Sequence, residues 1–430
     1  MRHALVLTYY FPPAGGVAVQ RILKFCKYLP EFGWKPTIVT VDSGSYIFTD
    51  ETLVRQVPPD LNVHYTSSIE PFRLYNMLRG VKGKNMPTLS VGGTTKKSWL
   101  QKVAEFLRAN IFIPDARVGW VPYAVSQSLK LFHEKKFEAL ITTGPPHSTH
   151  LAGLKIKNKT GIKWVADFRD PWTKNMINEY LPRLSVVNRI EKKMEESVLR
   201  HADAVTVVGK GMVSDFINRT SRVIAIHNGY DEDDFHVGAI STAGYFMMRH
   251  VGNLILPMNV PVLWQTLSEL RQSNRQFKEK FRLEFIGSYH PQTALDLEKY
   301  NLKDCTTLIP FVSHRDAIGY MKGAELLLFV VPNYTNRNWV ITGKIFEYIA
   351  SGSAIMPLGP ADSDAAEILA SSGREKMIDY EDAAGMKKHI IDIFEKWQRG
   401  DLPKYAVCAY PQYSRKNQTK ILAELLNEIT

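Results

Sequence analysis

The sequence contains little cysteine and no long apolar run. Its 430 residues include three cysteines, Cys26, Cys305 and Cys408, and none has metal-ligand spacing. This content argues against a disulfide framework and predicts a reducing, cytoplasmic location. No apolar run approaches the roughly 20 residues that a helix needs to span a bilayer. The apolar start, Met1–Phe11, runs into a Pro/Gly loop, which favours a first buried strand over a signal peptide.

Two common nucleotide-binding fingerprints are also missing. The first glycine loop reads Pro-Pro-Ala-Gly-Gly, which does not fit G-x-G-x-x-G, and no G-K-[ST] occurs in the chain. These absences argue against a nicotinamide-dependent dehydrogenase and against a P-loop NTPase. The sequence also has no internal repeat of solenoid period and no low-complexity tract.

The length and the charge distribution are informative. A chain of 430 residues with 45% hydrophobic and 23% charged residues is long enough for two ordinary domains. Residues 1–227 hold 32 Lys and Arg against 18 Asp and Glu, a net +14, whereas residues 228–430 have a net charge of −3. The basic first half is expected to face an anionic surface or substrate. Nucleic acid, anionic lipid and a lipid-linked diphosphate all remain open.

Short apolar runs alternate with helical patterns in both halves. Ala4–Leu7, the glycine loop, the amphipathic Val17–Leu29 and the apolar Pro36–Val41 form a βαβ pattern, which predicts a parallel sheet. The same pattern starts again at Tyr245, with predicted turns at Gly252-Asn253 and Gly287-Ser288. The sequence therefore predicts an α/β protein of two domains, with a boundary near residue 229 at an Asn-Gly turn.

The most informative stretch is 342–352, which reads Thr-Gly-Lys-Ile-Phe-Glu-Tyr-Ile-Ala-Ser-Gly. Thr342 is predicted to cap a helix, and Gly343 allows close approach of a ligand. Lys344 then lies where the helix dipole favours an anion such as phosphate. Glu347 follows one turn later, about 5 Å along the axis, at a distance that suits the sugar hydroxyls of a nucleotide. An ordinary capped helix before a buried strand is the alternative.

Residues 343–352, followed by Gly359-Pro360 and Asp364-Ala365-Ala366-Glu367, resemble the donor-binding segment of family-4 glycosyltransferases with the GT-B fold. The resemblance recurs along nearly the whole chain. It implies two Rossmann-like domains whose parallel sheets face each other across a cleft. Residues 1–228 would bind the acceptor, with a C-terminal helix at about 411–430 packing back onto them. Residues 229–410 would bind a nucleotide-sugar donor.

The resemblance also implies a donor site. Glu347 would hold the ribose, and the position eight residues earlier, often a second Glu in the family, is Trp339. The diphosphate and the nucleobase would be held by loops after successive strands and by the helix start. The residues implied are Gly252, Asn253, Gly287, Ser288, Phe311, Val312, Thr342, Gly343, Lys344 and Glu347.

Two clusters in the first half resemble family segments at the reaction centre. Gly-Pro-Pro-His-Ser contains His147, and Asp-Phe-Arg-Asp-Pro-Trp contains Asp167, Arg169 and Asp170. Both follow predicted strands of a parallel sheet, where open α/β sheets bind ligands. The alternatives are a turn histidine and a structural ion pair. The loop with Gly15 and Gly16 resembles the acceptor-side loop of the family.

Residues 69–113 mix basic with apolar and aromatic residues. From Trp99 onward they have an amphipathic helical pattern, which is typical of a membrane-surface helix. A core-packed helix with a solvated basic face is the alternative. We expect peripheral contact with an anionic inner membrane face through this segment.

Together these features predict a glycosyltransferase that acts on a glycan or lipid-linked acceptor. By resemblance it would retain anomeric configuration and need no cofactor and no metal. Asp362-Ser363-Asp364 has the form of a metal-binding D-x-D, but it falls at a predicted helix start, where Asp commonly caps. The alternatives are a nucleotide-sugar epimerase or hydrolase, and a basic nucleic-acid-binding protein, for which no base-stacking motif is found.

Overall fold

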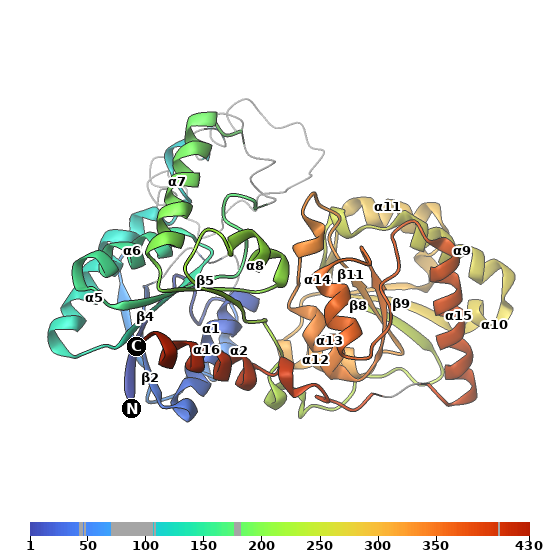
Figure 1. The fold of residues 1–430 in the computed structure, drawn as a ribbon. Helices are drawn as coiled ribbons and strands as arrows, with labels where there is room; N and C mark the ends of the chain where they lie inside the picture. Colours follow the sequence, from blue (N-terminus) through green and yellow to red (C-terminus); the bar gives the residue numbers. More distant parts are fainter. Residues whose placement is uncertain (43–45, 47–48, 70–105, 107–108, 176–181, 403–404) are drawn as a thin grey trace, which may run out of the picture. The chain divides into compact units, whose positions relative to one another are not determined.

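The computed structural model describes the chain except for residues 43–45, 47–48, 70–105, 107–108, 176–181 and 403–404 (Figure 1). The chain divides into two compact units. Unit 1 comprises Met1–His227 and Arg415–Thr430, and unit 2 comprises Asn228–Ser414. The turn Pro411–Tyr413 lies in unit 2, so the return to unit 1 begins at Arg415 rather than at 411.

Unit 1 is built on one parallel sheet. Among its described residues the strand order is β3-β2-β1-β4-β5-β6-β7, and every pairing is parallel. The order reverses at β1, so β1 and β4 form the switch point whose carboxyl edge receives ligands in open α/β sheets. The strands are β1 (Arg2–Leu7), β2 (Trp34–Val41), β3 (Asn62–Thr66), β4 (Ala139–Gly144), β5 (Lys163–Phe168), β6 (Ala204–Val207) and β7 (Val223–Ala225).

Helices cover both faces of this sheet and thereby bury its central strands on both sides. One face packs against α5, α6, α7 and α8, and the other against α1, α2 and the C-terminal helix α16. The helices are α1 (Val17–Tyr28), α2 (Glu51–Val54), α5 (Val121–Glu134), α6 (Ser148–Thr160), α7 (Ser185–His201), α8 (Lys210–Phe216) and α16 (Arg415–Ile429).

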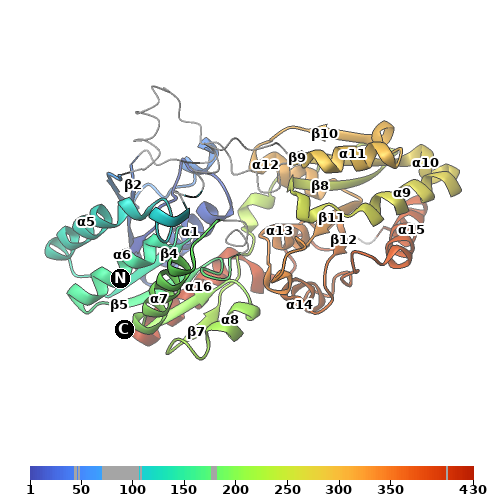
Figure 2. The same cartoon turned by 90° about the horizontal axis from the view of Figure 1, so that it is seen from above.

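Unit 2 repeats this design with a smaller sheet. Its described strands follow the order β10-β9-β8-β11-β12, again with parallel pairings and a switch point between β8 and β11 (Figure 2). The strands are β8 (Phe246–Leu254), β9 (Phe281–Tyr289), β10 (Thr306–Ile309), β11 (Leu326–Val330) and β12 (Ala354–Leu358). The α/β class with two parallel-sheet, Rossmann-like domains is thus confirmed.

Two sets of helices enclose the sheet of unit 2. One face packs against α9, α10, α11 and α15, and the other against α12, α13 and α14. Their bounds are α9 (Pro261–Ser273), α10 (Arg275–Lys280), α11 (Pro291–Lys299), α12 (His314–Lys322), α13 (Lys344–Ser351), α14 (Asp364–Ser371) and α15 (Ala383–Arg399). In the part of the chain that the structure describes, no helix combines the length and the apolar character that crossing a membrane demands.

The turns predicted at Gly252-Asn253 and Gly287-Ser288 are wrong. β8 and β9 stay paired through both sites, with Gly252 beside Gly287 and Asn253 beside Ser288. Both glycines have a positive φ, +106° for Gly252 and +125° for Gly287. Because glycine tolerates this backbone, the strands can change direction without losing their pairing.

Candidate functional site

The carboxyl edge of the unit 2 sheet brings a lysine onto the glycine pair. A Cβ atom on Gly252 would lie 2.5 Å from Lys344 Nζ, and one on Gly287 would lie 2.7 Å from the Gly252 carbonyl oxygen. Lys344 is the first residue of α13, which begins after β11 at the switch point. The ammonium group therefore lies over bare backbone at a helix start, which is a favourable setting for phosphate.

The side chain of His250 contacts this lysine. Its Nδ1 lies 3.0 Å from the Leu328 carbonyl oxygen, and its Nε2 lies 3.5 Å from Lys344 Nζ. Burial and the nearby Lys344 lower the pKa of His250 to about 3, so the imidazole is neutral and Nε2 accepts from the lysine. Burial also lowers the pKa of Lys344 to about 8, although Glu347 opposes this shift. The lysine is thus charged at neutral pH but close to its titration range.

Substitution of Gly252 by alanine is expected to weaken phosphate binding, whereas the loss of folding stability should be small. The new Cβ would displace Lys344 Nζ and Cε, which are the flexible end of a side chain. The positive φ should cost about 1–2 kcal/mol of stability. Gly244→Ala is the matched control, because Gly244 has a φ of +80° and no atom within 4 Å of its Cβ position. Urea unfolding and nucleotide titration of both variants test this. Equal nucleotide affinities in the two variants would contradict it.

The start of α13 differs from the prediction in one respect. Gly343, not Thr342, is the N-cap residue, and no side chain caps the helix. Gly343 has a helical backbone and no side chain that could accept a hydrogen bond from the first turn. The first turn thus presents main-chain N–H groups without a side-chain cap, while Thr342 and Gly343 are both partly exposed beside Lys344.

Glu347 faces a histidine that the sequence interpretation did not assign. Its Oε1 lies 3.0 Å from His314 Nε2, at the first residue of α12. The other ring nitrogen, Nδ1, lies 4.0 Å from Asp234 Oδ2. All three side chains retain partial exposure, between 16% and 18%. A ligand could therefore reach Glu347 while His314 holds its orientation.

The substitution His314→Ala is expected to weaken nucleotide binding about fivefold. One hydrogen bond to a charged partner of this kind is worth about 1 kcal/mol or more, and its loss lets Glu347 leave the orientation in which it is predicted to meet a ribose. Isothermal titration at constant pH measures the change, with the exposed His133→Ala in α5 as the control. Unchanged or tighter binding by His314→Ala would show that His314 does not position the carboxylate.

The remaining predicted donor residues lie on the same edge of unit 2. Ser288 Oγ donates to Asn253 Oδ1 at 2.9 Å, directly beyond the glycine pair. Phe311 and Val312 follow β10 in the segment that leads into His314, and the Phe311 side chain is 73% exposed. Trp339 ends a short 3-10 turn before α13 and is partly buried. Of the predicted donor residues, the structure thus brings Gly252, Gly287 and Lys344 together, whereas Glu347 meets His314.

In unit 1 the carboxylate of Asp167 is fully occupied. Arg21 donates to both oxygens at 2.8 and 3.2 Å, and the hydroxyls of Thr143 and Thr206 donate at 2.8 and 2.7 Å. Burial alone would raise the pKa of Asp167, but Arg21 and the two hydroxyls lower it below its usual value. With four donors on a buried carboxylate, the structure favours the structural ion pair over an acid or base role.

His147 and Arg169 retain unused hydrogen-bonding groups. The His147 ring stacks on Trp172, with centroids 5.0 Å apart and planes 4° apart. Both ring nitrogens of His147 and the Arg169 Nη1 atom are buried without a hydrogen-bond partner among the described residues. Arg169 donates its Nε to the Gly144 carbonyl oxygen at 3.1 Å and its Nη2 to that of Pro145. Burial, aided by His150 and Arg169, lowers the pKa of His147, so its ring is neutral.

The three other residues predicted in unit 1 are Gly15, Gly16 and Asp170, and they have different environments. Gly15 and Gly16 lie in the loop between β1 and α1, and Gly16 is the helix N-cap with a φ of +107°. Asp170 follows Arg169 and is exposed as a residue, but partial burial of its carboxyl group raises its pKa against the opposing charge of Arg169. Asp167, Arg169 and His147 come together at the carboxyl ends of β4 and β5, since Arg169 bonds the segment that precedes His147.

Solved structures with the same fold cover essentially the whole chain. Sucrose-phosphate synthase from Thermosynechococcus elongatus aligns with 100% of this chain and 95% of its own, at 13% identity and a TM-score of 0.58. Anabaena HepE in complex with UDP-glucose aligns over 100% of both chains, at 13% identity and a TM-score of 0.61. The chain has the GT-B fold.

A third GT-B-fold relative carries another activity in its name. A putative UDP-N-acetylglucosamine 2-epimerase from Listeria monocytogenes aligns with 99% of this chain and 96% of its own, at 11% identity and a TM-score of 0.52. No protein-family model and no curated protein sequence matches the chain. At these identities the similarity establishes the fold alone.

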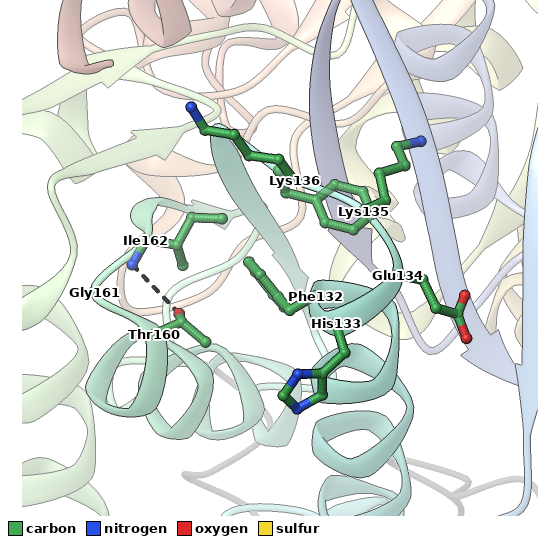
Figure 3. Close-up of a pocket in the computed structure, with 9 residues that line it drawn as sticks. Phe132, His133, Glu134, Lys135, Lys136, Thr160, Gly161 and Ile162 are labelled. Atoms are coloured by element: carbon green, nitrogen blue, oxygen red, sulfur yellow. Dashed lines mark hydrogen bonds between the residues drawn. The ribbon is translucent and has the colours of Figure 1, made fainter.

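A surface hollow lies at the opposite edge of the unit 1 sheet. It has a volume of about 410 Å³ and is lined by residues 132–137 and 160–162, which precede β4 and β5 (Figure 3). In this hollow Ile162 donates its main-chain N–H to Thr160 Oγ1 at 3.3 Å. Because ligands of open parallel sheets bind at the carboxyl ends, this hollow is not the site expected of a GT-B protein.

The D-x-D sequence has a structural explanation. Ser363, rather than either aspartate, caps α14, since its hydroxyl accepts from Ala366 N at 3.2 Å. Asp362 accepts from Asn338 Nδ2 at 2.9 Å. Among the described residues no three His, Cys, Asp or Glu side chains are grouped so that they could hold a metal ion.

Proposed function

We propose that this chain is a glycosyltransferase that moves a sugar from a nucleoside-diphosphate sugar to a hydroxyl of a glycan or lipid-linked acceptor. The observation that carries the proposal is Lys344 Nζ over the Gly252–Gly287 pair, with Glu347 one turn further along α13. A cation above bare backbone fits a diphosphate, and a partly exposed carboxylate fits ribose hydroxyls.

Unit 2 would hold the donor. The diphosphate would contact Gly252, Gly287 and the α13 start, and the exposed Phe311 would meet the base beside Val312. The HepE structure with UDP-glucose shares this fold and supports a nucleotide-sugar as the donor. Lys344 and the α13 N–H groups would stabilise the charge on the departing diphosphate.

Unit 1 would bind the acceptor. The buried ring nitrogens of His147 and the Arg169 Nη1 atom provide donors and an acceptor for sugar hydroxyls. Because His147 is neutral, it can accept a proton from a hydroxyl or hold one toward an oxygen. The resemblance to family 4 supports retention of configuration, with no metal and no cofactor, and a cytoplasmic location at the inner membrane face.

Release of nucleoside diphosphate from a panel of nucleotide-sugars tests the proposal. The wild type should release one diphosphate faster when a total lipid extract is added, and Glu347→Gln should lose this activity. Glu298→Gln, an exposed carboxylate of α11, is the control. No release from any nucleotide-sugar, with or without the extract, would contradict transfer.

A nucleotide-sugar epimerase is the second candidate, because the Listeria epimerase shares the fold over nearly the whole chain. It would convert the nucleotide-sugar with no acceptor present. Its product would be another nucleotide-sugar, in which the bond between the sugar and the diphosphate is intact. Nuclear magnetic resonance of the sugar ring protons separates this outcome from transfer.

A further inference from the structure

A group of exposed apolar side chains lies around the start of α7, the green helix at the top of unit 1 in Figure 1. We call this group the α7 patch. Its members are 39% to 61% exposed, which is unusual for large apolar residues that gather on one surface. The apolar residues of the α7 patch are Phe106, Ile111, Leu184, Val186 and Ile190.

Hydrogen bonds hold the two segments of the α7 patch together. Asn110 Nδ2 donates to the Pro182 carbonyl oxygen at 2.8 Å, and Asn110 Oδ1 accepts from Leu184 N at 2.8 Å. The same Nδ2 also donates to the Phe106 carbonyl oxygen at 2.8 Å. A single asparagine side chain thus places Phe106 and residues 109–111 beside residues 182–186.

The exposed face of α7 combines apolar and basic residues. Val186, Arg189, Ile190 and Lys193 have the spacing i, i+3, i+4 and i+7, which puts them on one stripe of the helix. All four are exposed, whereas Val187, Glu191 and Val198 on the other side are buried. Long basic side chains beside apolar ones suit a surface where charge lies outside and hydrocarbon beneath.

Two of the three carboxylates of α7, Glu191 and Glu195, are buried on the inner side, and Glu196, at the edge of the stripe, is neutralised by an ion pair. Glu191 pairs with Arg183. Glu195 accepts from the Thr173 hydroxyl at 2.9 Å and, like Glu196, pairs with Arg219. The stripe of Val186, Arg189, Ile190 and Lys193 is therefore cationic and apolar, with Glu196 at its edge offset by Arg219, in a half of the chain with a net charge of +14.

We propose that the α7 patch docks on an anionic lipid bilayer. The positive stripe complements acidic headgroups, and the apolar residues beside it can enter the boundary between headgroups and acyl chains. The inner side of α7 also reaches the candidate reaction cluster, because Glu195 accepts from the main-chain N–H of Thr173 at 3.1 Å, directly after the Trp172 that stacks on His147. The same helix would thus connect the membrane surface with the acceptor side of unit 1.

Sedimentation of the full chain with lipid vesicles tests this proposal. The wild type should bind phosphatidylcholine vesicles that contain phosphatidylglycerol and should bind pure phosphatidylcholine vesicles far more weakly. Each cation near an anionic surface is worth roughly a fivefold change in affinity. The double variant Arg189→Glu with Lys193→Glu should therefore lose at least about 25-fold, and Val186→Ser with Ile190→Ser should also release the protein.

The control variant is Leu295→Ser with Leu308→Ser, which removes two exposed apolar residues from unit 2. It should bind like the wild type, and circular dichroism should show all variants folded. The proposal is overturned if the wild type does not sediment, if the Val186 and Ile190 variant binds unchanged, or if neutral vesicles bind equally well. A change of molar mass by light scattering in the Val186 and Ile190 variant would instead assign the α7 patch to a second copy of the chain, which also overturns it.

Discussion

Asp167→Asn is expected to lower the free energy of unfolding of unit 1 by about 3–5 kcal/mol, the usual cost of breaking a buried ion pair on one side. In the variant, the Arg21 guanidinium would stay buried but would lose the charge of the residue 167 carboxylate. Arg21 also donates to the main-chain oxygens of Ile226 and His227, both at 2.9 Å, so the disturbance reaches the end of unit 1. Urea unfolding at pH 7 measures the loss.

The exposed Asp60 of unit 1 provides the control. Asp60→Asn should change stability by less than about 0.5 kcal/mol, as exposed substitutions usually do. Because folding lowers the pKa of Asp167, its contribution is complete above the unfolded value of about 3.9 and is lost as the pH falls toward the lowered pKa. A fully stable Asp167→Asn protein that lacks activity would contradict the structural role and restore a catalytic one.

Lys344→Met is expected to weaken nucleoside-diphosphate binding by about 30- to 150-fold, or 2–3 kcal/mol, because a charged hydrogen bond to phosphate is lost. The wild-type affinity should also depend on pH. The protonated lysine binds the anion, and the pKa of Lys344 in the free protein is about 8. Affinity should therefore decline above pH 8, by up to about tenfold per pH unit.

Isothermal titration between pH 7 and 9.5 measures both effects, with proton uptake on binding at pH 8.5 in the wild type.

Folding lowers the pKa of Lys344, so its charge opposes folding below pH 8, and this opposition is relieved as the pH rises toward the unfolded value of about 10.4. Ligand-free Lys344→Met should accordingly be more stable than the wild type at pH 7. A flat affinity up to pH 9.5 would show that Lys344 does not hold the phosphate.

Local patterns were enough to predict the strands and the central helix. The apolar run Ala4–Leu7 became the fully buried part of strand β1, as parallel strands require. Lys344 and Glu347 were identified because helical spacing places them one turn apart near a helix start. The α/β class followed from the alternation of such segments.

Contacts between distant residues could not be predicted in this way. Arg21 and Asp167 are 146 residues apart, so no local sequence pattern showed that the Asp167 carboxylate accepts hydrogen bonds from Arg21. His314 and Glu347 are 33 residues apart, and the role of His250, which follows Arg249 in strand β8, depends on the position of Lys344. The prediction that Thr342 caps α13 was wrong because the N-cap position falls one residue later, at Gly343.

The membrane prediction for residues 69–113 stays a prediction, because residues 70–105 and 107–108 lie outside the described part of the chain. Phe106 and Ile111 of that segment do enter the α7 patch. The rest of the patch comes from α7, whose exposed stripe was not recognised because its alternating charges resemble an ordinary solvated helix.

A thermal-shift panel with UDP, GDP, dTDP, CMP and NAD tests the central claim most directly. One nucleoside diphosphate should stabilise the wild type, by roughly 2.7 kcal/mol at a concentration near 100 times its dissociation constant, and this gain should disappear in Glu347→Gln. NAD should have no effect. If no nucleoside diphosphate shifts the unfolding temperature, or if Glu347→Gln responds like the wild type, unit 2 does not hold a nucleotide-sugar at Lys344 and Glu347.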